Sequence, residues 1–196
     1  MARIGRIFID ADTLKARVDG LGGEIASDGP DDLLLVTVLK GGVVFLADLV
    51  RRLVPAVEVD FLALTPYAEG EHPPGVARLV KDLDRALLGR HVLLVEDVVD
   101  TGLTLSFILR MLEEREPASL RVCTLLDRAE KRIVDLPIAY RGFTLGDEYL
   151  VGYGLDFFGL YRNLPCLVAV DDLEALQADP LALVGSLGAW GVWPTS

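Results

Sequence analysis

The chain has few of the residues from which metal centres and disulfide scaffolds are built. Its 196 residues include two cysteines, Cys123 and Cys166, and two histidines, His72 and His91. Two cysteines cannot form a disulfide framework or a cysteine-type zinc site, and both lie in apolar runs that favour buried, reduced thiols. The two histidines argue against a histidine-rich metal centre and against a histidine-based hydrolase.

Basic charge is also scarce. Nineteen Lys and Arg face 30 Asp and Glu, which leaves a formal net charge of -11. Nucleic acids and anionic membranes attract basic surfaces, so we expect neither a nucleic-acid nor a membrane partner. A bound phosphate must then be held locally, by backbone N–H groups, a few cations or a metal.

Long apolar runs are missing as well. No run approaches the roughly 20 apolar residues of a membrane helix, and residues 1–15 turn acidic before an apolar core of signal-peptide length appears. We therefore expect a cytoplasmic protein. With 52% hydrophobic and 25% charged residues, the composition is that of an ordinary globular protein. The length favours one domain, residues 1–196.

Apolar runs alternate with segments of helical periodicity along the chain. Strands are expected at 33–39, 57–64, 77–80, 91–95, 120–126 and 167–170, and helices at 12–26, 41–53 and 102–114. Asp12 is expected to cap the first helix, which Gly20, Gly22 and Gly23 weaken or shorten. Continuously apolar strands such as 33–39 are typical of parallel sheets. The sequence predicts an α/β fold with a largely parallel central sheet flanked by helices.

Two segments do not fit this alternation. Residues 67–75 (YAEGEHPPG) cannot build a core, and a loop of this length is usually functional. From about residue 173 the chain becomes an apolar C-terminal extension with little charge, including Trp190 and Trp193. We expect this extension to pack against the body of the protein or against a second subunit.

The central motif is VLLVEDVVDTGLTLSFIL, residues 92–109, in which a buried strand runs into acids, a turn and a helix. The unpaired N–H groups of the helix N-terminus suit a phosphate, and Thr101 and Thr104 add hydroxyl donors. Glu96 and Asp97 can accept hydrogen bonds from a sugar diol or hold hydrated Mg²⁺. Together these features predict a ribose 5-phosphate pocket. The alternative is an ordinary capped helix with acids near its N-terminus.

This motif resembles the phosphoribosyl-diphosphate signature of the type I phosphoribosyltransferases. LKGG (residues 39–42) and VGYGLD (151–156) resemble segments of the hypoxanthine–guanine branch, and the resemblance covers roughly residues 12–170. It implies that family's single-domain α/β fold with a small base-binding hood. It also implies transfer of a 5-phosphoribosyl group to hypoxanthine or guanine in purine salvage, with Mg²⁺ as cofactor and a homodimer or homotetramer as the assembly.

The resemblance implies roles around the ribose and its phosphates. Asp100 would be the catalytic acid–base group facing the purine N7, and Glu96 and Asp97 would hold the ribose hydroxyls directly or through Mg²⁺. The 5-phosphate and the pyrophosphate would be bound by Thr101, Gly102, Leu103 and Thr104, and by Lys40, Gly41 and Gly42, respectively. In the family, the Leu–Lys peptide bond at this position can be cis. By residue chemistry alone, Lys40 could merely end a strand.

The resemblance also implies roles around the base. Arg128 stands where the family places a lysine that donates to the purine O6, and Tyr67 lies on the mobile catalytic loop. The remaining implied residues are Tyr149 (stacking), Leu150 (backbone contact to the base edge), Asp156 (a second Mg²⁺) and Arg162 (pyrophosphate).

Four of these residues have a simpler alternative. Tyr149 could be core, Asp156 and Arg162 a surface ion pair, and Arg128 the ion-pair partner of Asp127 or Glu130.

Two residues depart from the family pattern and leave other functions open. They are Arg128, in place of the lysine, and Pro66, in place of a serine before the loop tyrosine. Pro66 has neither a hydroxyl nor an N–H group. The alternatives are a regulator that binds phosphoribosyl diphosphate without turnover, and a phosphoribosyltransferase for another base such as xanthine or a pyrimidine.

Overall fold

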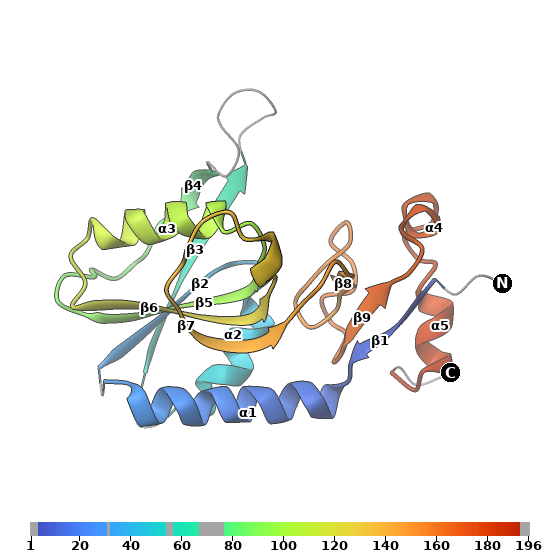
Figure 1. The fold of residues 1–196 in the computed structure, drawn as a ribbon, viewed down its shortest axis with the longest axis horizontal. Helices are drawn as coiled ribbons and strands as arrows, with labels where there is room; N and C mark the ends of the chain where they lie inside the picture. The colour runs from blue at the N-terminus through green and yellow to red at the C-terminus, as the bar shows by residue number, and fades with distance from the viewer. Residues whose placement is uncertain (1–3, 31, 54–56, 67–76, 193–196) are drawn as a thin grey trace. The chain divides into compact units, whose positions relative to one another are not determined.

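The computed structural model describes residues 4–30, 32–53, 57–66 and 77–192. The chain divides into two compact units (Figure 1). The larger unit comprises Val18–Gly146, and the smaller unit comprises Met1–Arg17 together with Asp147–Ser196. Among the described residues, no helix has the length and apolar character needed to cross a membrane.

The larger unit is built on a six-stranded sheet with strand order β4-β3-β2-β5-β6-β7. Its strands are β2 (Leu33–Leu39), β3 (Glu58–Pro66), β4 (Ala77–Lys81), β5 (His91–Val99), β6 (Ser119–Asp127) and β7 (Ile138–Thr144). Neighbouring strands are parallel except β4, which pairs with β3 in the antiparallel direction. The expected α/β fold with a largely parallel sheet is confirmed.

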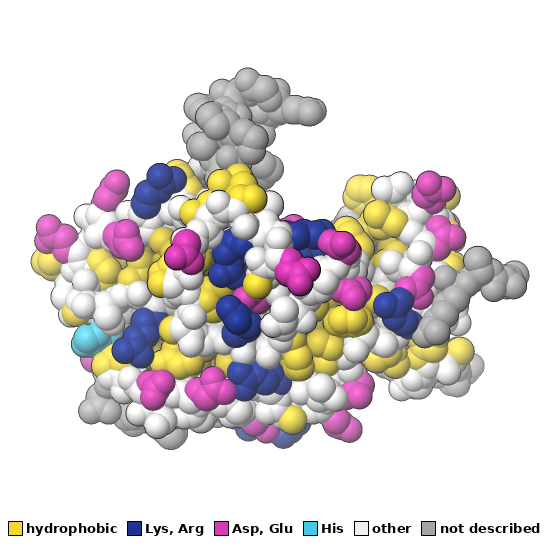
Figure 2. All heavy atoms as spheres, viewed as in Figure 1, with side chains coloured by type: hydrophobic (Ala, Val, Ile, Leu, Met, Phe, Trp, Pro, Cys, Tyr) yellow, Lys and Arg dark blue, Asp and Glu magenta, His cyan; other side chains and the backbone are white. Residues whose placement is uncertain are grey.

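Helices cover both faces of this sheet. Helix α3 (Leu103–Glu113) lies on one face and α2 (Val43–Val50) on the other (Figure 1). A short 3-10 helix, η1 (Ala129–Lys131), lies between β6 and β7. Basic and acidic side chains are interspersed on the face shown in Figure 2, with several Lys and Arg gathered over the region of η1 and β7. The chain therefore carries basic groups near η1 and β7 despite its negative net charge.

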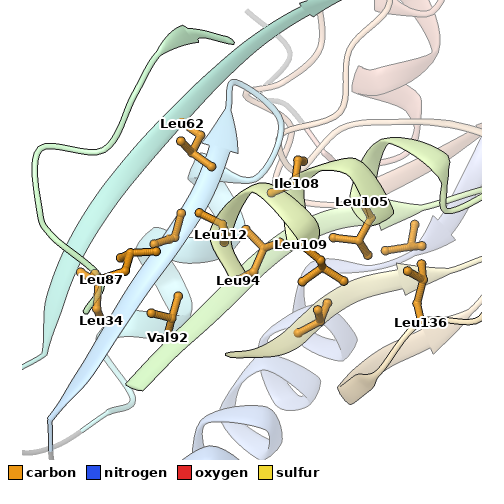
Figure 3. Close-up of a cluster of buried hydrophobic side chains, with 13 residues drawn as sticks. Leu34, Leu62, Leu87, Val92, Leu94, Leu105, Ile108, Leu109, Leu112 and Leu136 are labelled. Carbon is orange, nitrogen blue, oxygen red and sulfur yellow. The ribbon is translucent and has the colours of Figure 1, made fainter. Parts of the chain in front are cut away.

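Helix α3 is held against the sheet by leucine-rich packing (Figure 3). Its inward residues recur at helical spacing and are at most 5% exposed: Leu105, Ile108, Leu109 and Leu112. They meet side chains from β2 and β5, including Leu34, Val92 and Leu94. Burying each such side chain fully contributes roughly 1.5–3 kcal/mol to the stability of the fold. This packing fixes the N-terminus of α3 at the carboxyl end of β5.

The smaller unit contains a three-stranded antiparallel sheet in the order β1-β9-β8. Its elements are β1 (Gly5–Ile9), β8 (Tyr149–Val151), β9 (Leu167–Val170), α4 (Leu173–Ala178) and α5 (Val184–Ala189). The prediction that residues 167–170 form a parallel strand is wrong, because both partners of β9 run in the opposite direction. A strand's local sequence does not specify the direction of its neighbours.

The C-terminal extension packs within the smaller unit, which confirms the expectation that it lies against the body. Leu176, Leu183 and Leu187 are buried in one cluster with residues of β8 and β9, and Trp190 packs against that cluster. Trp193 lies outside the described residues.

Several element boundaries differ from those predicted. Helix α1 runs over Ala11–Asp28, and Asp10 rather than Asp12 caps it, because the backbone N–H of Thr13 donates to Asp10 Oδ1 at 2.7 Å. The glycines of α1 do not shorten it, since its buried face, including Leu21, holds it in place. Helix α2 is shorter than the predicted 41–53, and β1, β7 and β8 were not predicted.

Candidate functional site

Three loops of the larger unit meet at one edge of its sheet. Strands β2, β5 and β6 are parallel neighbours, so their carboxyl ends lie at the same edge. Lys40–Gly42 follow β2, Asp100–Gly102 follow β5 and Arg128 follows β6. Ligands of open α/β sheets bind at such carboxyl ends. The structure therefore brings these predicted site residues together.

The turn between β5 and α3 lines a cavity that could hold an anion. Gly102 is the N-cap of α3 and has φ +86, a left-handed conformation that glycine adopts without steric cost. A cavity of about 170 Å³ opens here, lined by Glu96, Val98, Val99, Asp100, Thr101, Gly102, Thr104, Leu105 and Ile108. The first N–H groups of α3 and the exposed hydroxyls of Thr101 and Thr104 can donate to an anion in this cavity.

The acidic pair lies within β5 rather than in the loop after it, because the strand continues to Val99. Glu96 Oε1 is buried and has no hydrogen-bond partner among the described residues. Burial, together with the neighbouring charge of Asp97, raises the pKa of Glu96 well above its ordinary value. A buried carboxylate oxygen without a donor is costly, so a hydroxyl, a water or a cation bound to this atom would stabilise the charged form of Glu96.

Glu96 has an oxygen that fits a magnesium ion. No cluster of three or more potential metal-ligating side chains occurs among the described residues. Mg²⁺ does not need one, because it keeps several waters and takes one or two carboxylates together with substrate phosphates. The unpaired Oε1 of Glu96 supplies the free oxygen that such an ion would use.

The Lys40 loop lies directly against β5. The Leu39–Lys40 peptide bond is cis, as the family resemblance allows. A Cβ on Gly41 would overlap Oδ2 of Asp97, and one on Gly42 would lie 2.2 Å from Oγ1 of Thr37. Only glycine permits this approach, which places the Gly41 backbone beside Asp97 and the Gly42 backbone beside Thr37. Lys40, which precedes them, is exposed.

Arg128 begins the segment after β6 and is half-buried. Its backbone N–H donates to the carbonyl of Val99 at 2.9 Å, which ties it to the end of β5. The neighbouring carboxylate, Asp127, is buried and forms ion pairs with Arg132 and Arg141. Sequence reasoning missed this ion-pair cluster. The available signal was an acid at the end of β6, directly after two leucines, with several arginines following it.

The smaller unit carries the remaining described candidates. The ring of Tyr149 meets Phe157 edge-on at 6.1 Å, and its exposure of 39% excludes a place in the core. Burial of the hydroxyl, with the nearby charge of Asp156, raises the pKa of Tyr149. Leu150 is buried on β8. Tyr67 lies outside the described residues.

Asp156 and Arg162 form an ion pair in this structure. Arg162 Nη2 lies 2.6 Å from Asp156 Oδ1, while Oδ2 accepts a hydrogen bond from the Gly159 N–H at 2.7 Å. Arg162 Nη1 also donates to the carbonyl of Gly154 at 2.6 Å. This is the alternative that the sequence left open. Binding of metal by Asp156 and of pyrophosphate by Arg162 would require the two side chains to exchange partners.

Comparison with known proteins identifies the family. The family described as "Phosphoribosyl transferase domain" matches residues 10–157. The hypoxanthine-guanine phosphoribosyltransferase of Mycobacterium avium is 45% identical over 175 residues, covering 86% of each chain. The hypoxanthine phosphoribosyltransferase of Escherichia coli K12 is 41% identical over 162 residues, covering 81% of this chain and 91% of its own.

A solved structure agrees with these relatives. The crystal structure of a hypoxanthine-guanine phosphoribosyltransferase from Bacillus anthracis superposes with a TM-score of 0.82 at 38% identity. The match covers 87% of this chain and 100% of the other. Fold, sequence and the arrangement of loops at the sheet edge lead to the same conclusion: this chain belongs to the phosphoribosyl transferase domain family.

Proposed function

We propose that this protein is a purine-salvage phosphoribosyltransferase. It transfers the 5-phosphoribosyl group from 5-phosphoribosyl 1-diphosphate to hypoxanthine or guanine, giving IMP or GMP and pyrophosphate. The observation that carries the proposal is the cavity at the end of β5, which is lined both by the first residues of α3 and by Glu96, whose Oε1 has no hydrogen-bond partner among the described residues. The named relatives support the same reaction.

The reaction breaks the bond between the ribose C1 and the pyrophosphate oxygen, and forms a bond from C1 to a purine nitrogen. As pyrophosphate leaves, positive charge develops on the ribose. The carboxylate of Glu96 lines the cavity that would hold the ribose and would stabilise this charge electrostatically. Asp97, beside Gly41, is assigned to the same role. The N-terminus of α3, with Thr101 and Thr104, would hold the 5-phosphate and fix the ribose in place.

The leaving pyrophosphate is assigned to the loop after β2. Exposed Lys40 would supply a cation there, and the backbone N–H groups of Gly41 and Gly42 would supply donors. When bound, Mg²⁺ would neutralise part of the negative charge on the phosphates. Arg162 is assigned to the same pyrophosphate, and Asp156 to a second Mg²⁺, after their ion pair has opened.

The purine is assigned to Asp100, Arg128, Tyr149 and the Leu150 backbone. Asp100 is exposed at the cavity and would hold the proton at the purine N7. Arg128 carries only donors, so it would pair with the O6 of a 6-oxopurine and not with the 6-amino group of adenine. Tyr149 presents an exposed ring for stacking. Leu103 is assigned to the phosphate turn, and the role of Tyr67, outside the described residues, stays a prediction from the family resemblance.

The test is a panel of bases with the purified protein, 5-phosphoribosyl 1-diphosphate and Mg²⁺. We expect IMP and GMP from hypoxanthine and guanine, and no AMP from adenine. Tight binding of the diphosphate without turnover on any base would instead support the regulator, and xanthine or a pyrimidine as best substrate would support the other transferase. A cytoplasmic location, one functional domain and a homodimer or homotetramer stay predictions.

A further inference from the structure

Asp127, the last residue of β6, has no role in the reaction proposed above, yet its carboxylate is 0% exposed. Arg132 contacts Oδ1, and Arg141 Nε lies 2.5 Å from Oδ2, within ion-pair distance although outside hydrogen-bond geometry. Taking charged groups out of water is costly, and pairing often does no more than offset that cost. The cluster is therefore a poor source of stability, and a geometric role is the better explanation for it.

Arg132 connects this cluster to the phosphate-binding turn. Its side chain is 13% exposed, and its Cγ lies 3.5 Å from the position that a Cβ would occupy on Gly102. The next residue, Ile133, donates its backbone N–H to the carbonyl of Thr101 at 3.0 Å. Two consecutive residues of the segment after β6 thus contact the turn that holds the 5-phosphate in the proposed function.

The same short segment carries Arg128, the residue assigned to the purine O6. Its backbone N–H donates to the Val99 carbonyl, and its carbonyl accepts from the Lys131 N–H, both at 2.9 Å. Asp127 itself pairs with Val99 in the register of β5 and β6. The segment is therefore attached to β5 just before the turn and to the turn itself. The ion pair between Asp127 and Arg132 connects its two ends.

We infer that Asp127 is a positioning residue. Through Arg132 it fixes the separation between Arg128 and the phosphate turn, which is the separation that a nucleotide's base and 5-phosphate must match. The inference rests on the proposed function for the role of Arg128, but the contacts that it invokes all lie within the larger unit. Removing the ion pair loosens the segment and misplaces both binding groups without changing either of them.

The test compares Asp127→Asn, Arg132→Met and the double variant with a matched control. The control is Asp82→Asn. In the wild type, the Asp82 carboxylate accepts hydrogen bonds from Arg115 at 2.7 and 3.1 Å. Arg115 follows the C-terminal end of α3, whereas the phosphate turn precedes its N-terminal end. We expect Asp127→Asn and Arg132→Met each to raise KM for the diphosphate substrate and for hypoxanthine by roughly 10- to 100-fold, as small misplacements do. Asp82→Asn should leave both KM values unchanged.

The double variant and a conservative variant separate positioning from simple loss of folding. Because the two side chains act as one unit, the KM values of the double variant should be no higher than those of the more impaired single variant. Arg132→Lys keeps the charge, so its KM values should lie between those of the wild type and those of Arg132→Met. A purely structural role would lower the melting temperature and the folded fraction, while leaving both KM values as they are. Unchanged KM values in Asp127→Asn and Arg132→Met would overturn the inference, and Arg132→Met alone decides it if Asp127→Asn does not fold.

Binding of ribose 5-phosphate, measured by calorimetry, tests the inference independently of turnover. We expect weaker binding in Asp127→Asn and Arg132→Met than in the wild type and in Asp82→Asn. If the wild type binds ribose 5-phosphate but makes no nucleotide, the proposed function fails while this comparison still stands. Equal binding in all four proteins would overturn the positioning role, whatever the activity.

Discussion

Gly41 lies so close to Asp97 that a Cβ on Gly41 would stand 1.7 Å from Oδ2 of Asp97. Gly41 follows β2 and Asp97 lies on β5, and these two strands are parallel neighbours in the sheet. The loop assigned to the pyrophosphate and a carboxylate assigned to the ribose are therefore in direct contact. A side chain on Gly41 would therefore displace the Asp97 carboxylate.

The first prediction follows from that contact. Gly41→Ala should push the Asp97 carboxylate out of place and lower kcat/KM by about 100-fold, as small misplacements in an active site do. Gly23→Ala makes the same chemical change on α1, where a Cβ meets nothing within 4 Å. That control should keep full activity and gain roughly 0.5–1 kcal/mol of stability from better helix propensity. Equal kcat/KM in the two variants would contradict the prediction.

The second prediction concerns the proton at the purine. Asp100→Asn keeps the size of the side chain but cannot take up a proton. It should retain binding of the diphosphate substrate while lowering kcat by roughly 10²–10⁴-fold, the usual range for lost acid–base catalysis. Steady-state rates with hypoxanthine and calorimetry with the diphosphate measure the two effects. Near wild-type turnover would remove Asp100 from the mechanism.

The third prediction concerns base selection. If Arg128 donates to the purine O6, Arg128→Ala should lose most activity on hypoxanthine and guanine but still bind the diphosphate. Arg128→Lys should keep activity, because lysine is also a donor. In the parent, adenine should be rejected by roughly 10⁴–10⁵ in kcat/KM, the ratio typical of sites built around one hydrogen bond. The measurement is kcat/KM for hypoxanthine, guanine, xanthine and adenine in all three proteins.

Two results would refute the assignment of Arg128. One is an Arg128→Ala variant that uses hypoxanthine and guanine as well as the parent does. The other is a parent that prefers adenine. An ion pair between Arg128 and Glu130 alone would predict a change in stability and no change in base preference.

The fourth prediction is a pH dependence caused by Glu96. Burial, and then the charge of Asp97, raises the pKa of Glu96 in the folded protein. Between the unfolded and the folded pKa, the native state binds more protons than the unfolded state. The contribution of Glu96 to stability therefore falls as the pH rises through this interval.

Glu96→Gln tests this effect because it removes the charge and keeps the shape. The variant should be more stable than the wild type above the folded pKa of Glu96, and its melting temperature should decline less as the pH rises from 4. It should also lose Mg²⁺-dependent activity. Asp84→Asn, at an exposed carboxylate of the same unit, is the control. A Glu96→Gln variant whose stability follows the wild-type pH curve would rule out the burial effect.

The fifth prediction concerns the C-terminal extension. Leu183 is fully buried and Leu181 is 58% exposed, so one substitution can be compared at two sites two residues apart. Leu183→Ala should lower the free energy of unfolding by about 2–5 kcal/mol, and Leu181→Ala should change it by less than about 0.5 kcal/mol. Thermal unfolding measures both. Deletion from Gly188 onward should also destabilise, because Trp190 packs against the same cluster.

Much of the site could be predicted from local sequence. The apolar run of β2, the period of α3 and the Thr-Gly turn before it are set by residues close together in the chain. The carboxyl ends of adjacent parallel strands then bring the Lys40 loop, the acidic pair and the turn together. A buried strand, a helix N-terminus and a glycine turn each have a local pattern, so these features were predicted.

Other features were decided only by tertiary structure. The antiparallel pairing of β9, the ion pairs of Asp127, and the partnership of Asp156 with Arg162 all depend on which side chains and strands meet in space. The cap at Asp10 depends on where α1 begins. The contact between Gly41 and Asp97 arises because β2 and β5 are neighbours in the sheet. A local pattern specifies the conformation of its own segment, whereas the partner of a buried charge or strand is selected by packing between residues distant in the chain.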